Sequence, residues 1–470
     1  MLKKLPWKAF LFLLTFSCFA EKVAAQEYQP KWSSLNQRPV PQWWSDAKFG
    51  IFVHWGLYSV PAYAPVNEVE GVYEKYAEHY LTKLLEGNKY FTAYQKQNYG
   101  ENSTYKDFVP LFKAEFFEPD KWADLFKRSG AGYVVLTSKH HDGYCLWPSE
   151  HSPGWNSVET GPRRDLINDL SASVRKAGLR MGLYYSLLEW DNPLYKPETI
   201  DKWTTQHMIP QMKDLVNRYK PEIIFSDGEW DHTSTELRSE EFLGWLYNDS
   251  PVKNTVVVND RWGKESRSKH GGYYTTEYDL IGDELNSSKI EHPWEESRGI
   301  GTSYGYNQFE TLEHYSSSKE LIDLLIDKVS NGGNLLLNVG PTASGLIPVI
   351  MEQRLLDIGK WLNVNGEAIY GTRAWSMRPD NMKETDVFYT LKGDDLYVIC
   401  TKWPQAPLAI SGVNKASRVS LLGAKEAVKF KASKDKLTIT PPAINPGNAP
   451  SEHAWVFKVE NFRQTELSKL

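Results

Sequence analysis

Ionisable and polar side chains follow several short apolar runs in this sequence, each where a run ends. The clearest case is residues 221–231 (PEIIFSDGEWD), in which an apolar, β-prone run leads to Asp227 and then to Gly228. A buried parallel strand that ends in a carboxylate presents it at the sheet edge where α/β proteins carry out their chemistry. Asp227 could instead cap a following helix, because Asp is a favoured N-cap residue. The ends of the other runs decide between these interpretations.

Five further apolar runs or strand-like segments end in groups that could take part in chemistry. These groups are His54, the pair His140 and His141, the pair Tyr184 and Tyr185, Arg261, and the pair Glu295 and Glu296. Helix capping does not account for them, since His, Tyr and Arg cap poorly. In a barrel, the carboxyl ends of the strands converge on one mouth whatever their separation in sequence. We therefore predict a functional site at this mouth, with Asp227 in it.

Two carboxyl groups on different strands favour hydrolysis of a glycosidic bond. One carboxylate attacks the anomeric carbon or activates water, and the other carboxyl group protonates the leaving oxygen. Asp227 is the better nucleophile, because a carboxylate among Arg and His donors stays ionised. Glu295 follows Pro293 and Trp294, an apolar neighbourhood that would raise its pKa towards that of a general acid. Glu296 remains an alternative on these grounds.

A catalytic metal is the first alternative to this chemistry. His140 and His141 would point to opposite faces of an extended strand, so they could share a metal only if the backbone turned there. The sequence has no His-x-x-x-His motif and no closely spaced Cys pair. We predict no metal ligands and no cofactor, and we expect the histidines to donate hydrogen bonds to sugar hydroxyls.

Composition agrees with a carbohydrate ligand and argues against a nucleic-acid partner. The 470 residues are 41% hydrophobic and 24% charged, which is ordinary for a globular protein. The formal net charge of −5 leaves no basic excess to neutralise phosphates. The 18 Trp and 26 Tyr exceed what packing usually needs. Their faces suit the apolar face of a sugar ring, although core packing accounts for most of them.

Strands and helices alternate over roughly the first three quarters of the chain. Alternation of this kind indicates βαβ units and a parallel sheet. With its weaker elements the count approaches eight, which favours a (β/α)8-like TIM barrel over an open doubly wound sheet. No Gly-x-Gly-x-x-Gly motif follows the first strand, which further weakens a dinucleotide-binding fold. The predicted strands are residues 50–53, 132–138, 181–186, 223–226, 255–258 and 334–339.

The two ends of the chain differ from this central part. Six short strands with turn residues between them follow residue 375, which predicts a C-terminal antiparallel β-sandwich domain over residues 375–470 after a barrel over 26–374. Residues 1–25 combine a basic start, a short apolar run and a small-residue cleavage site, as in a signal peptide. With so few cysteines, we expect an exported bacterial protein, periplasmic or at the cell surface, with no membrane span.

Five motifs together resemble the α-L-fucosidases of glycoside hydrolase family 29. They occur in the same order as in that family and extend from about residue 43 to the end of the predicted barrel. The motifs are residues 49–56 (FGIFVHWG), 137–143 (TSKHHDG), 182–186 (GLYYS), 227–228 (DG) and 365–370 (NGEAIY). The predicted C-terminal sandwich is similar to the second domain of that family in its pattern of short strands separated by turn residues.

The resemblance implies an exo-acting enzyme that removes terminal fucose from fucosylated oligosaccharides or glycoconjugates. It implies retention through a covalent fucosyl-enzyme, with Asp227 as nucleophile, and it favours Glu295 over Glu296 as general acid/base. Such a mechanism places the two carboxyl groups roughly 5–5.5 Å apart. The residues expected to contact the sugar or orient the nucleophile are His54, Glu78, His140, His141, Tyr185, Arg261 and Trp230.

Two residues depart from the family pattern, and one other class of protein competes with the enzyme. His79 stands where a Trp is common, and Ser226 stands where an aromatic residue often precedes the nucleophile. A non-catalytic carbohydrate-binding protein on the same barrel would keep the aromatic residues and histidines but lose one carboxylate. Both Asp227 and Glu295 are present, which favours the enzyme.

Overall fold

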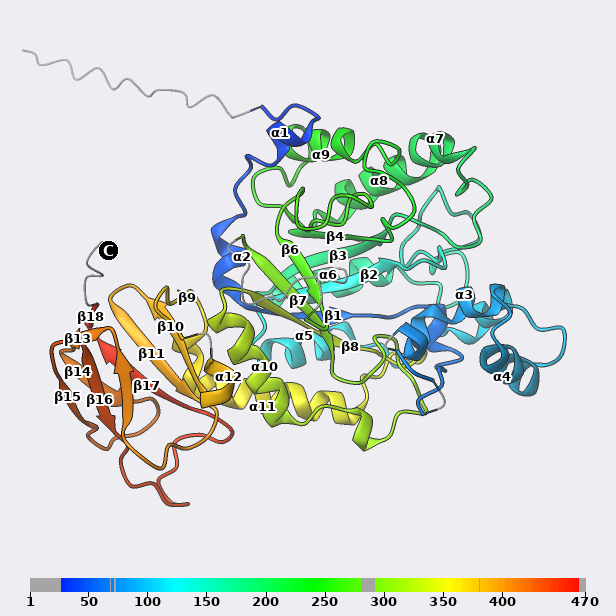
Figure 1. The fold of residues 1–470 in the computed structure, drawn as a ribbon. Helices are drawn as coiled ribbons and strands as arrows, with labels where there is room; N and C mark the ends of the chain where they lie inside the picture. The colour runs from blue at the N-terminus through cyan, green and yellow to red at the C-terminus, as the bar shows by residue number, and fades with distance from the viewer. Residues whose placement is uncertain (1–26, 68, 72, 280–291, 380, 465–470) are drawn as a thin grey trace, which may run out of the picture.

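The computed structural model describes residues 27–67, 69–71, 73–279, 292–379 and 381–464. Its larger part is a barrel-like sheet surrounded by helices, and its smaller part consists of antiparallel sheets at the C-terminal end (Figure 1). This arrangement confirms the predicted fold class. The predicted signal peptide lies outside the described residues. None of the helices in the described ranges has both the length and the apolar character needed to cross a bilayer.

Eight parallel strands form the sheet of the barrel, in the spatial order β5-β4-β3-β2-β1-β8-β7-β6. This is the chain order read around a circle and opened between β5 and β6. Two backbone hydrogen bonds join these edges, from Gly272 N to Asn259 O at 3.1 Å and from Tyr273 N to Val258 O at 3.0 Å. The strands are β1 (Phe49–Val53), β2 (Tyr133–Lys139), β3 (Arg180–Ser186), β4 (Ile223–Asp227), β5 (Val257–Val258), β6 (Tyr274–Glu277), β7 (Trp294–Gly299) and β8 (Asn334–Val339).

Helices cover the outside of this sheet, and polar caps set where several of them begin. The Asp165 side chain caps α6 by accepting a hydrogen bond from Asn168 N, and Ser317 and Glu320 form a capping box at the start of α10. The barrel helices are α5 (Pro119–Arg128), α6 (Leu166–Lys176), α8 (Ile209–Tyr219), α9 (Ser239–Asn248), α10 (Ser318–Ser330) and α11 (Val349–Asn365).

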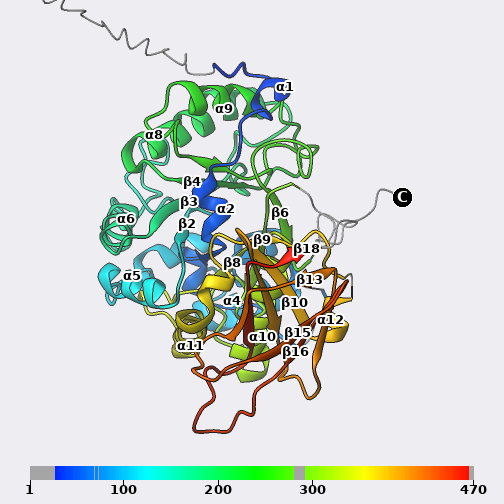
Figure 2. The same cartoon turned by 90° about the vertical axis from the view of Figure 1, so that its left-hand side faces the viewer.

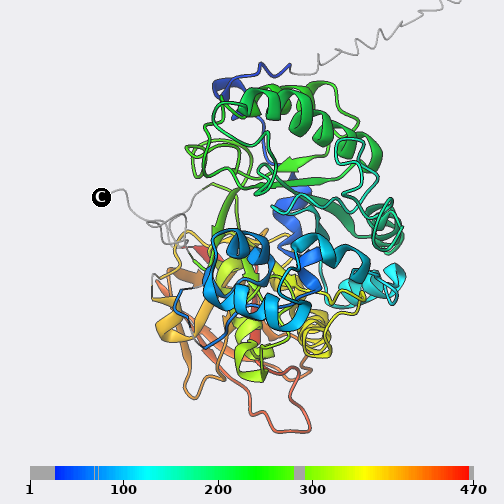
Figure 3. The same cartoon turned by 90° about the vertical axis from the view of Figure 1, so that its right-hand side faces the viewer.

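A long insertion after β1 builds part of the mouth of the barrel. Its helices α3 and α4 stand at the right in Figure 1 and come to the front in Figure 3. It contains η1 (Leu57–Ser59), η2 (Tyr73–Lys75), η3 (Ala77–His79), α3 (Tyr80–Leu85), α4 (Lys89–Tyr99) and η4 (Tyr105–Leu111). Other short helices of the described residues outside the C-terminal domain are α1 (Trp32–Leu35), α2 (Gln42–Ala47), α7 (Ile200–Lys202), the π-helical η5 (Trp203–Met208), η7 (Leu312–His314) and η8 (Gly366–Ala368).

The interior of the barrel is packed with side chains rather than open. Large residues pointing inward from successive strands form one buried cluster, which α2 closes at the amino end with Trp44. A packed interior of this kind leaves room for a ligand only at the carboxyl end. The cluster comprises Trp44, Phe52, Tyr133, Val135, Tyr184, Ile223, Phe225, Val257, Tyr273 and Leu336.

The C-terminal part consists of antiparallel sheets of five, three and two strands, ordered β14-β17-β11-β10-β9, β12-β16-β15 and β13-β18. It lies beside α10 and α11 (Figure 2). Trp361 Nε1 of α11 donates to Ala454 O at 3.0 Å across this junction. The elements are β9 (Arg373–Ala374), α12 (Met382–Thr385), β10 (Val387–Lys392), β11 (Asp395–Cys400), β12 (Leu408–Ser411), β13 (Val413–Lys415), β14 (Arg418–Leu421), β15 (Lys429–Ala432), β16 (Lys436–Thr440), β17 (Trp455–Glu460) and β18 (Arg463–Gln464).

Candidate active site

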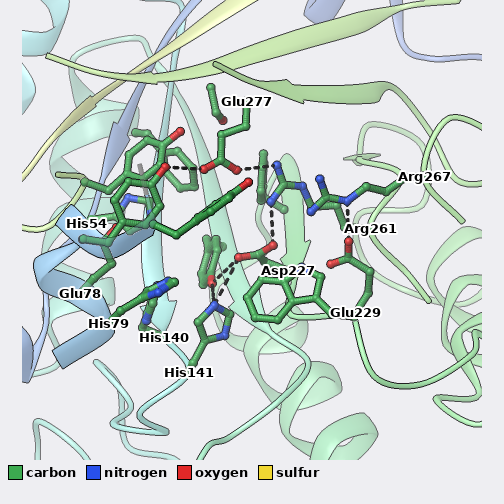
Figure 4. Close-up of a pocket in the computed structure, with 18 of the residues that line it drawn as sticks. His54, Glu78, His79, His140, His141, Asp227, Glu229, Arg261, Arg267 and Glu277 are labelled. Atoms are coloured by element: carbon green, nitrogen blue, oxygen red, sulfur yellow. Dashed lines mark hydrogen bonds and ion pairs between the residues drawn. The ribbon is translucent and has the colours of Figure 1, made fainter. Parts of the chain in front are cut away.

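A cavity of about 530 Å³ opens where the barrel strands end. Residues from the strand ends meet there with residues of the insertion and of the loops after β4, β5 and β7. Phe52 and Phe225, which belong to the packed interior, also line it. The ionisable side chains in its wall include His54, Glu78, His79, His140, His141, Asp227, Glu229, Arg261, Arg267 and Glu277, which Figure 4 labels. Lys264, Tyr73, Tyr76, Tyr184 and Tyr304 also line it.

Asp227, the last residue of β4, is the most strongly engaged carboxylate of this cavity. Its Oδ1 accepts a hydrogen bond from Arg261 Nη1 at 2.7 Å, and its Oδ2 accepts one from the Tyr184 hydroxyl at 2.9 Å. His141 Nε2 lies 3.5 Å from Oδ2. Burial alone would raise the pKa of Asp227, but Arg261 and His141 hold it well below its usual range. Asp227 is therefore ionised and aimed into the cavity.

The backbone after Asp227 rules out the interpretation that this residue is a helix cap. The next helix, α9, begins only at Ser239, with Arg238 at its N-cap. Gly228 has a φ of 78°, and a Cβ there would lie 2.9 Å from Leu188 and 3.1 Å from His141 Cε1. Only glycine fits this left-handed, crowded turn. The turn leads the chain away from the cavity and leaves the Asp227 carboxylate at its edge.

Ser226, the residue for which the sequence offered no role, links the end of β4 to Asn259, the residue that follows β5. Its Oγ donates to Asn259 Oδ1 at 2.7 Å, and Asn259 Nδ2 donates back to Ser226 O at 2.8 Å. This pair extends the short pairing of β4 with β5, so that Asp227 and Arg261 are held on adjacent strand ends. A small hydroxyl residue fits this position because it faces the neighbouring strand rather than the cavity.

The predicted histidines lie together in the cavity wall. β2 ends at Lys139 and the chain turns, with Gly143 N bonded to His140 O at 3.0 Å, so both His140 and His141 face the cavity. His54 is held by a 2.7 Å hydrogen bond between its Nδ1 and Asn338 Oδ1. Burial lowers the pKa of His54 to about 3 and that of His140 well below its usual value. Both rings are neutral, as suits hydrogen bonding to hydroxyl groups.

Glu78 and His79 reach the cavity from η3 of the insertion. Glu78 is buried and its Oε2 accepts hydrogen bonds from Gly305 N at 2.7 Å and Ser303 Oγ at 3.1 Å. Burial raises its pKa to about 7, against these donors. His79, the residue that departs from the family pattern, also lines the cavity and packs near His140 and His141. The insertion thus completes the wall that the strand ends begin.

Two carboxyl groups that the prediction did not place in the site are also present. Glu277 ends β6, where its Oε2 accepts from Arg261 Nη2 at 3.3 Å and its Oε1 from the Tyr76 hydroxyl at 2.9 Å. Glu229 accepts from Arg267 Nε at 2.5 Å. Burial raises the pKa of Glu229, with Arg267 opposing the shift. Figure 4 shows Arg261 between Glu277 and Asp227.

The assignment of Tyr185 to the sugar site is wrong, and its neighbour takes that place. Tyr184 lines the cavity and donates to Asp227, whereas the Tyr185 hydroxyl donates to Gln211 Oε1 of α8 at 2.8 Å. Successive side chains of a strand point to opposite faces. One of the two tyrosines must therefore face the barrel interior and the other the surrounding helices.

The expectation that Glu295 and Glu296 lie at the carboxyl end of a strand is also wrong, because both stand near the start of β7. Glu295 is 1% exposed and accepts a hydrogen bond from the Tyr133 hydroxyl at the start of β2. Glu296 accepts from Thr276 and pairs with Arg298 outside the barrel interior. The β7 residue that lines the cavity is Ser297, roughly 6.5 Å along the strand from Glu295. Glu295 is thus not brought together with Asp227.

Arg261 and Trp230 lie where the sequence predicted, in the cavity wall. Arg261 Nε is anchored by Thr275 Oγ1 at 3.0 Å while its terminal nitrogens reach Asp227 and Glu277. Trp230 follows the Gly228 turn, is 44% exposed, and places its ring 5.1 Å from that of His141. The described ranges contain no cluster of three or more His, Cys, Asp or Glu side chains suited to a metal ion.

Comparison with known proteins places this geometry in context. A family model described as alpha-L-fucosidase matches residues 15–367, and one described as alpha-L-fucosidase C-terminal domain matches residues 380–460. The tissue alpha-L-fucosidase of Homo sapiens is 42% identical over 97% of both chains. The alpha-L-fucosidase of Branchiostoma floridae is 41% identical over 96% of this chain and 98% of its own. The crystal structure of Thermotoga maritima alpha-fucosidase in complex with fucose is 36% identical, covers 92% of this chain and 100% of its own, and superposes with a TM-score of 0.79.

Proposed function

This chain belongs to the α-L-fucosidase family of glycoside hydrolases, and we propose that it removes terminal α-L-fucose from glycans by a retaining double displacement. The observation that carries this proposal is the ionised Asp227 carboxylate at the edge of a cavity whose inner wall is buried. A cavity closed at one end accepts the end of a glycan rather than its middle, which supports exo action.

Asp227 acts as the nucleophile in this mechanism. Arg261 and Tyr184 each hold one of its oxygens, so the attacking atom is oriented before the sugar binds. Attack on the anomeric carbon forms a fucosyl ester of Asp227 and releases the leaving group. Water then attacks the same carbon from the face that the leaving group vacated. Two inversions at one carbon give net retention.

Glu277 takes the role of general acid/base that the sequence had given to Glu295. It lines the cavity and shares the Arg261 guanidinium with Asp227. A bridge through one guanidinium keeps the two carboxyl groups near each other, as the roughly 5–5.5 Å separation in retaining enzymes requires. Glu229 is the second candidate, because its raised pKa would suit an acid. Its ion pair with Arg267 instead favours a supporting role.

The remaining residues of the buried wall bind the fucose ring. His54, His140 and His141 line this wall with imidazole rings; those of His54 and His140 are neutral, and the His140 Nδ1 atom has no hydrogen-bond partner among the described residues. Glu78, whose raised pKa makes it partly protonated near neutrality, can both donate to and accept from a hydroxyl. Trp230 offers an aromatic face to the apolar side of the sugar.

Hydrolysis of an aryl α-L-fucoside tests the nucleophile. Asp227→Gly should lose nearly all turnover, and added azide should restore part of it as a β-fucosyl azide, since a single displacement inverts the anomeric centre. The matched control is Asp231→Gly, an aspartate of the same loop whose carboxylate accepts a bond from Tyr195 instead. Wild-type-like turnover in Asp227→Gly would refute the assignment.

The dependence of rate on the leaving group tests the acid/base. Glu277→Ala should cost about 10²–10⁴ with a poor leaving group and much less with dinitrophenol, because a good leaving group needs no proton. Azide should then give the α-fucosyl azide, the product of two displacements. If Glu229→Ala shows this pattern and Glu277→Ala does not, the acid is Glu229.

Export belongs to the same proposal. The N-terminal sequence supports cleavage after Ala25 and delivery to the periplasm or cell surface of a bacterium, where fucosylated oligosaccharides or glycoconjugates are the substrates. Sequencing the N-terminus of the protein from its native host tests the cleavage: a mature chain beginning at Gln26 is expected, and an intact Met1 in the cell interior would contradict it.

A further inference from the structure

Two cationic side chains of the β5–β6 connection line the cavity outside its catalytic centre. Lys264 is exposed, and its ammonium group makes no hydrogen bond or ion pair with any described residue. Glu236 is close enough for the Lys264 charge to act on it, but its carboxylate accepts hydrogen bonds from the backbone and hydroxyl of Thr233 and not from Lys264. Lys264 is thus a cation available to a ligand.

Arg267 presents a second set of donors on the same side. Its Nε is bound to Glu229, and its two terminal nitrogens have no partner in the described part of the chain. In Figure 4, Arg267 and Glu229 lie on one side of Asp227, and His54, Glu78 and His79 lie on the other. The free donors therefore lie on the other side of Asp227 from His54 and His79.

Exposed aromatic rings accompany these cations. Trp230 is 44% exposed and Tyr73 is 59% exposed, although both line the cavity. Lys264 N donates to His232 O at 2.9 Å, which places the lysine beside the loop that carries Trp230. Tyr73 comes from η2 of the insertion, and its ring lies 5.5 Å from that of Tyr76, whose hydroxyl donates to Glu277.

The carboxylates nearby are already engaged. Glu229 and Glu277 are paired with arginines, and the carboxylate of Asp231, next to Trp230, accepts from the Tyr195 hydroxyl. Among the described residues, Lys264 and Arg267 are the cations that line this cavity outside the catalytic centre, and their terminal nitrogens remain free to bind a ligand. A rim of aromatic faces with an unpaired lysine and the free terminal nitrogens of Arg267 suits a sugar ring that carries a negative group.

We propose that Lys264 and Arg267, with Trp230 and Tyr73, form a subsite for an anionic leaving-group sugar, so that the enzyme prefers fucosides whose neighbouring sugar carries a sulfate ester or a carboxylate. This inference rests on the proposed function: the buried end of the cavity holds the fucose, and the leaving group faces the open rim. The anion binds in both ground and transition states, and its attraction weakens with salt.

Matched fucosyl disaccharides test the subsite. Three α-L-fucosyl disaccharides that differ only in the second sugar, which is neutral, sulfated or carries a carboxylate, are compared by kcat/KM at low and high salt. The anionic substrates should be preferred about three- to tenfold at low salt, and the preference should shrink at high salt. A preference confined to the sulfated or to the carboxylated disaccharide supports the proposal and identifies the anion.

Variants of one position assign the preference to the lysine. Lys264→Gln should bring the ratio of anionic to neutral kcat/KM close to one, Lys264→Arg should keep it, and Lys264→Glu should reverse it. The matched control is Lys269→Gln, an exposed lysine of the same connection that does not line the cavity. Equal kcat/KM for all three disaccharides, or an unchanged ratio in Lys264→Gln, overturns the inference. No turnover of any fucoside overturns the proposed function and this inference with it.

Discussion

Replacing Glu295 with glutamine tests whether Glu295 is a catalytic carboxyl group or one that is only buried in the packed interior of the barrel. The motif resemblance favours Glu295 as the acid, whereas the structure places it near the start of β7, bonded to Tyr133 and not in the cavity wall. Glutamine has the same shape and cannot ionise. We expect Glu295→Gln to keep turnover of an aryl fucoside within about twofold of wild type, since the residue is remote from the reacting atoms.

The effect of this change on stability follows from the environment of the carboxyl group. Burial raises the pKa of Glu295 from 4.5 to about 7, while the hydrogen bond from Tyr133 opposes the rise. Below pH 4.5 both folded and unfolded chains hold the proton. Between pH 4.5 and pH 7 the unfolded chain releases it and the folded chain keeps it. The free energy of unfolding therefore falls as pH rises, by up to about 3 kcal/mol above neutrality.

The glutamine variant should not show this fall in the free energy of unfolding as pH rises, because its side chain has no proton to release. Urea unfolding of wild type and Glu295→Gln should give similar midpoints near pH 5 and a higher midpoint for the variant near pH 8, because only the wild type carries the penalty of a buried charge there. Kinetics on the same samples complete the assay. A folded Glu295→Gln that loses turnover a hundredfold or more, with its unfolding as pH-dependent as that of wild type, would refute both the location and the argument.

Four further substitutions test how the site is built. Tyr184→Phe should lower kcat about ten- to a hundredfold, because a hydrogen bond to a charged group is worth about 1.5–3 kcal/mol. The adjacent Tyr185→Phe should leave kcat unchanged, and steady-state kinetics of both variants compares the two faces of one strand. Arg261→Met should raise the pKa of Asp227, so that the acidic limb of the kcat/KM profile moves to higher pH and activity at low pH is lost first. Ser226→Ala should lower the free energy of unfolding by about 1 kcal/mol with little change in kcat, and a large loss of kcat with unchanged thermal stability would contradict its bracing role.

The strands that sequence predicts well are those with continuous apolar, β-branched runs. Residues 132–138 and 334–339 agree with β2 and β8 to within a residue at either end. β6 (YTTE) and β7 (WEESRG) lack such a run and were not predicted as strands. Polar residues are tolerated there because they bond across the strand pair, as Thr276 does with Glu296. Hydrophobic patterning contains no signal for strands of this kind.

The errors in the site follow from the same cause. Without β7, Glu295 looked like the end of a segment, and without β6, Glu277 was not considered at all. The sequence offered no way to choose which of the adjacent tyrosines at the end of β3 faces inward. The strand register decides it: Asp227 of β4 pairs with Ser186, and Tyr184, two residues earlier, points to the same face as Ser186. Glu229 was visible two residues after Asp227, but its burial and its pairing with Arg267 depend on a loop that comes from another strand.

The differing surroundings of the cavity's carboxyl groups explain why Asp227 is suited to attack. Glu78 receives only neutral donors and its pKa is raised to about 7 by burial, so near neutrality much of it carries a proton. Glu229 is also raised, despite Arg267. Asp227 is also buried, yet it faces a guanidinium, an imidazole and a phenol at once, and these lower its pKa. Nucleophilic attack needs an ionised oxygen, and hydroxyl binding is served by a carboxyl group that can donate. The same burial therefore yields different chemistry according to which cation the fold brings to each acid.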